Sequence, residues 1–167
     1  MKSSHDNGAL KDLIANVEHR KILGNEAPGE DFVRPLAERG VDLYRNQDEQ
    51  GGIDFKVERL VFPGIQVMDP RIVKIAPGKC NELHRHAHKS VFVILSGHGE
   101  VLIGKKTVPV KKGDIAFVPR WVLHQTRNLD EAEPLAMLAI TDFGFTSAIL
   151  GDYDRATRLK TDHLGSW

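Results

Sequence analysis

The sequence has little that could cross-link it, carry it into a membrane or attract it to nucleic acid. Cys80 is the single cysteine, so no disulfide can form within the chain. No hydrophobic run is long enough to span a bilayer. Basic and acidic residues both number 23, so bulk charge favours neither nucleic acid nor a membrane as a partner. The first residues, MKSSHDN, lack the hydrophobic core of a signal peptide, and we therefore expect a cytoplasmic protein.

What the chain does contain is enough apolar material for one folded domain. Its 167 residues are 41% hydrophobic and 28% charged, which argues against disorder over most of its length. Apolar residues recur at helical spacing between Leu10 and Val17, and Gly24 is placed to end the segment. The pattern predicts an amphipathic helix over residues 9–23. Residues 24–52 are rich in glycine and proline and predict an irregular connection.

From residue 53 onward the pattern changes to short β-favouring segments separated by turn residues. The predicted strands cover residues 53–61, 65–68, 72–75, 91–95, 101–103, 107–110, 115–118, 124–128 and 135–141. Connections this short favour antiparallel pairing, because a parallel return needs a long crossover. The spacing of the segments therefore indicates an all-β sandwich or barrel.

These segments divide the chain into three expected parts. Residues 1–52 form an N-terminal helical arm and connection, residues 53–142 form the barrel, and residues 143–167 form a tail that packs on the barrel. Within the tail, Arg155–Lys160 could form a helical turn. The arm and the strand edges predict a homodimer, because exposed edge strands are usually covered or paired.

Histidines are concentrated in one short stretch. His84, His86 and His88 lie within five residues, and on an extended strand they project from the same face. His124 opens a later predicted strand. If the barrel brings this strand opposite His84, three imidazoles converge. Three neutral nitrogens leave two or three positions open on a divalent cation, which is typical of a catalytic metal rather than a structural one.

Two spaced motifs surround these histidines. The first runs Gly78, five residues, His84-Arg85-His86, three residues, Ser90, six residues, Gly97. The second runs Gly113, five residues, Pro119-Arg120-Trp121, two residues, His124, three residues, Asn128. Over roughly residues 55–142 this arrangement resembles the two motifs of the cupin family. Two positions differ from the family pattern: Ser90 stands where cupins have a glutamate ligand, and Trp121 stands where they have glycine.

The resemblance implies an antiparallel jelly-roll barrel with His84, His86 and His124 as metal ligands. Replacement of the glutamate by Ser90 is similar to the three-histidine ferrous cupins, which include dioxygenases. We therefore expect a divalent metal, iron first, with Mn, Ni, Zn and Cu as the other metals that accept imidazole. His88 is an alternative source of a fourth ligand.

Further residues are expected at the pocket. Ser90 could bind a metal-bound water or substrate, and Phe92, Ile94 and Trp121 could line the barrel mouth. A small organic molecule is the expected substrate. The alternatives to a dioxygenase-like enzyme are a sugar or sugar-phosphate isomerase or epimerase, a non-catalytic binding or sensor barrel, and a barrel that has lost its metal. The few charged groups named in the interior count against the isomerase.

Overall fold

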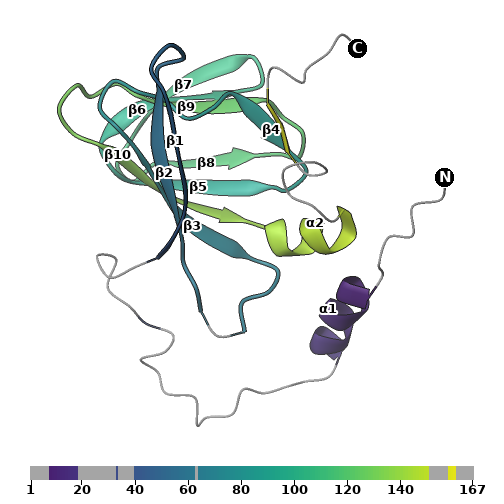
Figure 1. Cartoon of the computed structure of the whole chain (residues 1–167). Helices are drawn as coiled ribbons and strands as arrows, with labels where there is room; N and C mark the ends of the chain where they lie inside the picture. The colour runs from purple at the N-terminus through teal and green to yellow at the C-terminus, as the bar shows by residue number, and fades with distance from the viewer. Residues whose placement is uncertain (1–7, 19–32, 34–39, 63, 151–157, 161–167) are drawn as a thin grey trace.

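Two antiparallel sheets form the body of the protein in the computed structural model, which describes residues 8–18, 33, 40–62, 64–150 and 158–160 (Figure 1). Within these residues, the first sheet has six strands in the order β1 (Val41–Asp48), β2 (Ile53–Arg59), β3 (Asp69–Ile75), β10 (Leu135–Thr141), β5 (Ser90–Ser96) and β8 (Ile115–Val118). The second has five, in the order β11 (Arg158–Lys160), β4 (His84–His86), β9 (His124–Asn128), β6 (His98–Ile103) and β7 (Lys106–Lys111). The predicted all-β jelly-roll barrel is confirmed.

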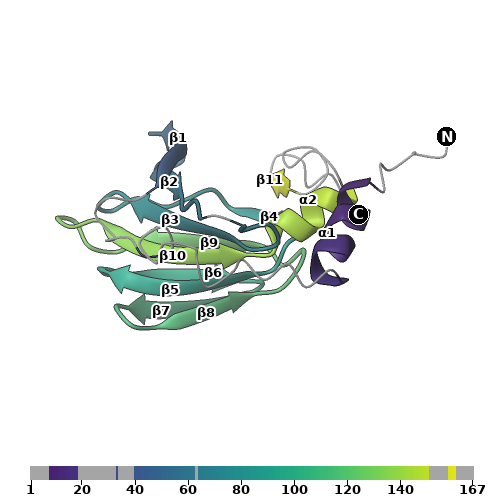
Figure 2. The same ribbon diagram turned by 90° about the horizontal axis from the view of Figure 1, so that it is seen from below.

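The core lies between the sheets because alternate side chains of each strand turn inward. In β10, Leu135, Met137 and Ala139 are buried while their neighbours are only half-buried. Phe55 and Val57 of β2 join them in the same cluster. Seen from below, the strands lie in layers, with both helices at one end of the barrel (Figure 2). Helix α2 lies near the histidine-rich strand, since the Phe143 ring contacts the His88 ring edge-on with centroids 5.7 Å apart.

Most predicted strands are present with small shifts of their ends, but residues 65–68 do not form the predicted strand. The backbone of this segment is bonded elsewhere, since the Val67 carbonyl accepts a hydrogen bond from the Gly144 amide at 3.1 Å. Its apolar side chains Val67 and Met68 are exposed. A short apolar run between prolines was therefore a poor indicator of a strand here.

Strand β1 (Val41–Asp48) corrects part of the prediction of an irregular connection over residues 24–52, of which residues 24–32 and 34–39 lie outside the described part of the chain. It pairs with β2 in antiparallel register, from Val41 opposite Arg59 to Asp48 opposite Ile53. Its side chains are mostly exposed on both faces, so it lacks the alternation that identifies a half-buried strand. A bulge between Asp42 and Tyr44 shifts the register. A bulge of this kind turns the following side chains to the other face of the strand.

The two helices differ from the sequence prediction in extent. Helix α1 (Gly8–Glu18) matches the start of the helix predicted over residues 9–23, and residues 19–23 lie outside the described part of the chain. Helix α2 (Phe143–Leu150) was not predicted, and α1 contacts it. Of the helical turn predicted over residues 155–160, residues 158–160 instead form β11, which pairs with β4, and residues 155–157 lie outside the described part of the chain. None of the described helices is long and apolar enough to cross a membrane.

Gly144 allows α2 to approach the segment before β3 closely. A Cβ atom at this position would overlap the backbone carbonyl of Gln66. We expect Gly144→Ala to lower the free energy of unfolding by about 2 kcal/mol, the usual cost of overpacking. Urea denaturation measures the change.

Ser147→Ala in the same helix is the control. Its side chain bonds only the Gly144 carbonyl in its own helix, at 3.2 Å, so we expect a change within about 0.5 kcal/mol. Equal stability of the two variants would contradict the close approach at Gly144.

Candidate metal centre

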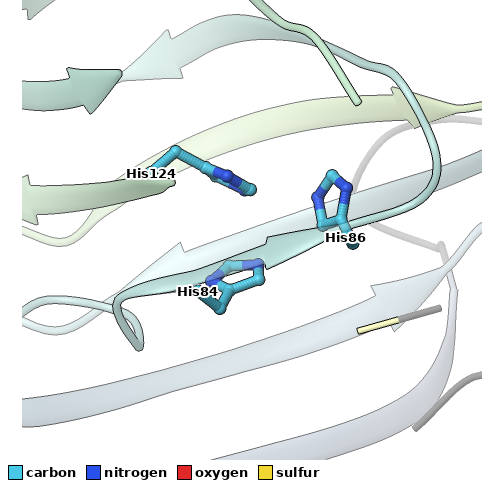
Figure 3. Close-up of side chains that lie close together, drawn as sticks. All are labelled: His84, His86 and His124. Carbon is cyan, nitrogen blue, oxygen red and sulfur yellow. The ribbon is translucent and has the colours of Figure 1, made fainter. Parts of the chain in front are cut away.

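Pairing between β4 and β9 brings the three histidines together. His84 and His86 alternate on β4, and His84 lies opposite His124 in β9. The exposed fractions of the three side chains are 7%, 3% and 1% for His84, His86 and His124. Figure 3 shows the three rings turned toward a common space. One nitrogen from each ring lies within 4.8 Å of the corresponding nitrogens of the other two.

Backbone carbonyls determine which nitrogen of each ring faces that space. Every Nδ1 atom lies within hydrogen-bond distance of a carbonyl oxygen two residues away along the chain. The partners of His84, His86 and His124 are the carbonyls of Glu82, His88 and Val122, at 2.8, 2.8 and 2.9 Å. A carbonyl oxygen only accepts, so each Nδ1 donates its hydrogen. The neutral rings therefore keep a lone pair on Nε2, the arrangement that suits metal ligation.

The three-histidine group could hold a metal ion. Ligand bonds of about 2.1 Å place two nitrogens on one metal at most about 4.2 Å apart. The observed limit of 4.8 Å is slightly wider than this. Because all three ligands come from one side, other coordination positions would face the cavity. Within the described residues, no other group of histidine, cysteine and carboxylate side chains converges in this way.

The imidazoles form part of the wall of a cavity between the two sheets. The wall combines aromatic and aliphatic side chains with a similar number of polar ones. It contains Tyr44, Phe55, Val57, Arg71, Val73, Asn81, His84, His86, His88, Ser90, Phe92, His124, Met137, Ala139 and Thr141. Apolar side chains beside a few converging polar groups are typical of a small-molecule site.

The family model for the cupin domain matches residues 71–141, the segment that carries all three histidines. Structural comparison finds a similar fold over a longer part of the chain. A cupin-2 domain of Rhodospirillum rubrum has a TM-score of 0.57 and 20% identity, with 74% of this chain and 76% of that one covered. Residues 71–141 therefore form a cupin domain.

Other cupins show how far the similarity extends. A cupin 2 conserved barrel domain protein of Rhodopseudomonas palustris has a TM-score of 0.55 and 25% identity, covering 70% of this chain and 74% of that one. Salicylate 1,2-dioxygenase of Pseudaminobacter salicylatoxidans has a TM-score of 0.52 and 20% identity, covering 56% of this chain and 28% of that one. At this level of identity, the second similarity concerns the fold alone.

Two named relatives match in sequence. The 1-hydroxy-2-naphthoate 1,2-dioxygenase of Nocardioides sp. (strain KP7) is 26% identical over 80 residues, which are 48% of this chain and 21% of that protein. The 1-methylthio-D-xylulose 5-phosphate methylsulfurylase of Rhodospirillum rubrum is 31% identical over 91 residues, 53% of this chain and 58% of that protein. The chain thus spans only part of the length of each relative.

Ser90 occupies the position at which the cupin pattern has glutamate. Its side chain is in the cavity wall and is 1% exposed. Its Oγ atom makes no hydrogen bond with the described residues. A buried hydroxyl without a partner costs about 1–3 kcal/mol, so it is usually satisfied by a water, ion or ligand. The unpartnered Oγ is consistent with a cavity that holds another group.

His88 lies beside the three-histidine group and is not part of it. Its ring stacks on that of His86, with centroids 3.5 Å apart and planes 13° apart. Burial, and then the nearby positive charge of Arg71, lower the pKa of His88 to about 3. His88 is therefore neutral at neutral pH. The geometry favours a role in packing the His86 ring over the role of fourth ligand.

Trp121 lies at the cupin glycine position and keeps a glycine-like backbone. Its φ is 61°, and the motif glycines Gly78, Gly97 and Gly113 have φ of 65°, 80° and 92°. The Trp121 amide donates to the His86 carbonyl at 2.8 Å, which ties this turn to the histidine strand. The indole is 42% exposed and is not in the cavity wall, contrary to the expectation that it lines the mouth. Ile94 is also outside the wall, since it is buried in the core.

Four polar wall residues, Tyr44, Arg71, Asn81 and Thr141, were missed from the sequence. Tyr44 belongs to β1, which was not predicted, and Asn81 precedes β4 in a loop. Arg71 was detectable, because it shares the inward face of β3 with Val73 and Ile75. A charged residue at a core position of a strand is a signal for function. The expectation that the interior offers few charged groups overlooked it.

We expect Trp121→Gly to be about 1 kcal/mol more stable than Trp121→Ala. Both remove the indole, but only glycine relieves the left-handed backbone, and part of that gain is offset by glycine's greater freedom in the unfolded chain. Ala148→Gly in α2 is the control and should be destabilised by about 1 kcal/mol. A Trp121→Gly variant less stable than Trp121→Ala in thermal or urea unfolding would disprove strain at this position.

Proposed function

We propose that the protein is a mononuclear non-haem metal enzyme of the dioxygenase type that acts on a small organic molecule. His84, His86 and His124 would hold the metal, with iron as the first choice and Mn, Ni, Zn and Cu as alternatives. The observation that carries the proposal is the set of three Nδ1–carbonyl hydrogen bonds, which leave three Nε2 lone pairs facing one space. Dioxygenases among the relatives by sequence and by fold support it.

The metal and the residues around it would each have a separate role in the reaction. Ferrous iron, when bound, would supply Lewis-acid and redox chemistry with open positions for substrate and dioxygen. The carbonyls of Glu82, His88 and Val122 fix the tautomers and orientations of the ligands. The apolar side chains of the wall, including Phe92 and Met137, would limit the access of water to the reacting groups. The Ser90 hydroxyl is positioned to bind a group that enters the cavity.

A sugar-phosphate isomerase or epimerase is the second candidate. Arg71 in the cavity wall supplies the cationic group that such an enzyme needs for its substrate. The similarity to the methylsulfurylase named for a xylulose 5-phosphate substrate points the same way. The described wall residues include no carboxylate to act as a general base beside the metal. The dioxygenase therefore fits the cavity better.

The homodimer and the cytoplasmic location stay predictions. Strand β8 is an edge of the six-stranded sheet, and its Ile115 and Phe117 are 71% and 52% exposed. These are the side chains that a second copy would cover. We propose no nucleic-acid or membrane partner, in line with the balanced charge.

Metal content tests the ligand set directly. Protein purified without a histidine tag should contain one metal ion per chain by elemental analysis. His84→Ala and His124→Ala should each retain less than a tenth of it, because two imidazoles hold a divalent cation much more weakly than three. His98→Ala makes the same chemical change at an exposed histidine outside the group and should retain the full content. Equal metal in all variants would remove the proposed site.

Oxygen uptake tests the reaction. Protein loaded anaerobically with Fe²⁺ should consume oxygen when a substrate is added from a screen of catechols, diketones, thiols and aromatic hydroxy acids. Zn²⁺-loaded protein should consume none, because zinc has no redox chemistry. His124→Ala should lose the activity and His98→Ala should keep it. No uptake with any compound, in protein that binds iron fully, would favour the isomerase or a binding module.

A further inference from the structure

The loop that follows β4 determines how one of the three histidine rings is oriented. The Nδ1 atom of His86 lies 2.8 Å from the His88 carbonyl, and this acceptor keeps the lone pair of the ring on Nε2. Residues 87–89 connect β4 to β5 and belong to neither strand. The orientation of the His86 ring therefore depends on the contacts that hold this loop in place.

Two charged residues from other parts of the chain bind the loop. Arg120 Nη1 donates to the Ala87 carbonyl at 2.6 Å. Asp142 Oδ1 accepts from the Lys89 amide at 2.7 Å, and the Asp142 amide donates to the Lys89 carbonyl at 3.3 Å. The bonded positions lie immediately before and after His88. Together, the two residues therefore hold the peptide units on either side of the carbonyl that orients the ring.

The two charged side chains also bind each other. Arg120 Nη1 donates to Asp142 Oδ1 at 3.2 Å, and Nη2 is bonded to Oδ2 of the same carboxylate. Two parallel hydrogen bonds of this kind fix the relative orientation of the two groups. The side chains are 33% and 27% exposed, and ion pairs in contact with water contribute little to overall stability. The pair is therefore better suited to position the loop than to stabilise the fold.

Each member of the pair belongs to a different part of the fold. Arg120 lies in the turn before β9, next to Trp121, whose amide donates to the His86 carbonyl at 2.8 Å. Asp142 lies between β10 and α2, and its carbonyl accepts from the Phe145 amide at 3.1 Å in the first turn of that helix. The pair thus ties the turn before β9 and the start of α2 to the loop after β4.

We propose that Arg120 and Asp142 are positioning residues for the metal centre. They hold residues 87–89 so that the His88 carbonyl accepts from Nδ1 of His86. Groups that orient a ligand from behind typically change metal affinity by about tenfold to a hundredfold when they are removed. The acceptors of the other two rings lie outside this loop, so removal of the pair should act first on one ring of the three.

This inference rests on the proposed function only for the presence of a metal. The position of the ring hydrogen can be measured in the metal-free chain, so the role of the pair is tested even if no metal binds. If the chain takes up no Zn²⁺ and the pair still controls the His86 tautomer, the proposed function is wrong and the inference stands. If Zn²⁺ binds fully and removal of the pair changes neither tautomer nor affinity, the reverse holds.

The first measurement locates the hydrogen of each ring by nitrogen-15 NMR of the metal-free full chain at about pH 8, where an ordinary imidazole is neutral. In the native protein, we expect the Nδ1–H form at His84, His86 and His124. In Arg120→Ala and in Asp142→Ala, His86 should show a mixture of both tautomers, because its acceptor is no longer held in place. His84 should keep the Nδ1–H form in both variants.

The second measurement is the Zn²⁺ affinity of the same proteins, obtained by competition with a chelator. Arg120→Ala and Asp142→Ala should each bind Zn²⁺ about tenfold more weakly than the native chain. Because both residues act on one loop, the double variant should lose little more than either single variant, rather than the about hundredfold loss of two independent contributions. Arg120→Lys keeps the charge and a donor without the planar fork, and it should recover part of the affinity.

Arg45→Ala is the matched control. Arg45 makes a similar two-pronged contact with Asp54, at 3.2 and 3.3 Å, between β1 and β2 and away from the loop. Its removal should leave the three tautomers unchanged and the Zn²⁺ affinity within twofold of the native value. If Arg120→Ala fails to fold, Asp142→Asn provides the measurement. It keeps an oxygen for the Lys89 amide but loses the charge, so its loss of affinity should be smaller than that of Asp142→Ala.

Several results would overturn the inference. One is a His86 ring that keeps its native tautomer in both alanine variants. Another is an equal change at His84, which would indicate general loosening of the fold rather than a role at one ring. A double variant whose loss of affinity equals the product of the single losses would show that the two residues act separately. Equal losses in Arg45→Ala and Arg120→Ala would show that any ion pair of this kind has the same effect.

Discussion

The pairing of β4 with β9 is the contact on which the site depends. It sets His84 opposite His124 and places His86 beside them by the alternation of the strand. Carbonyls from the same two segments then bind the three Nδ1 hydrogens, so the backbone that positions the rings also determines their tautomers. The acceptor for each ring thus belongs to the local chain. Because each of these carbonyls is two residues from its histidine, a short spaced motif can specify the orientation of the rings.

Much of the site could be predicted because it is encoded by spacing. Residues two apart on a strand share a face, so the His84 and His86 pair follows from extended structure alone. The convergence of His124 needed the resemblance to cupins, since nothing in the spacing says which distant strand lies opposite. Asn128 shows a different use of the same motif. Its Nδ2 donates to three carbonyls, of Ile75, Ala76 and Glu133, and it therefore fixes loops rather than ligands.

The features that sequence reasoning missed depend on tertiary context. Strand β1 has no hydrophobic alternation and is held by pairing with β2 and by ion pairs such as Arg45 with Asp54 at 3.2 Å. Helix α2 contains Gly144, which weakens a helical signal and is needed for close approach to Gln66. Trp121 was expected at the mouth because of the size of its side chain. Its backbone is left-handed instead, and the indole is 42% exposed.

The position of β4 between β9 and β11 has a consequence for the order in which the protein is made. Two of the three histidines lie on a strand of three residues, and one of its edges is covered by β11, the last described strand. On the ribosome, His84 and His86 are synthesised before the residues of β9 and β11, the two strands that pair with β4. One edge of β4 therefore stays unpaired in the nascent chain until residues 158–160 have emerged and can form β11.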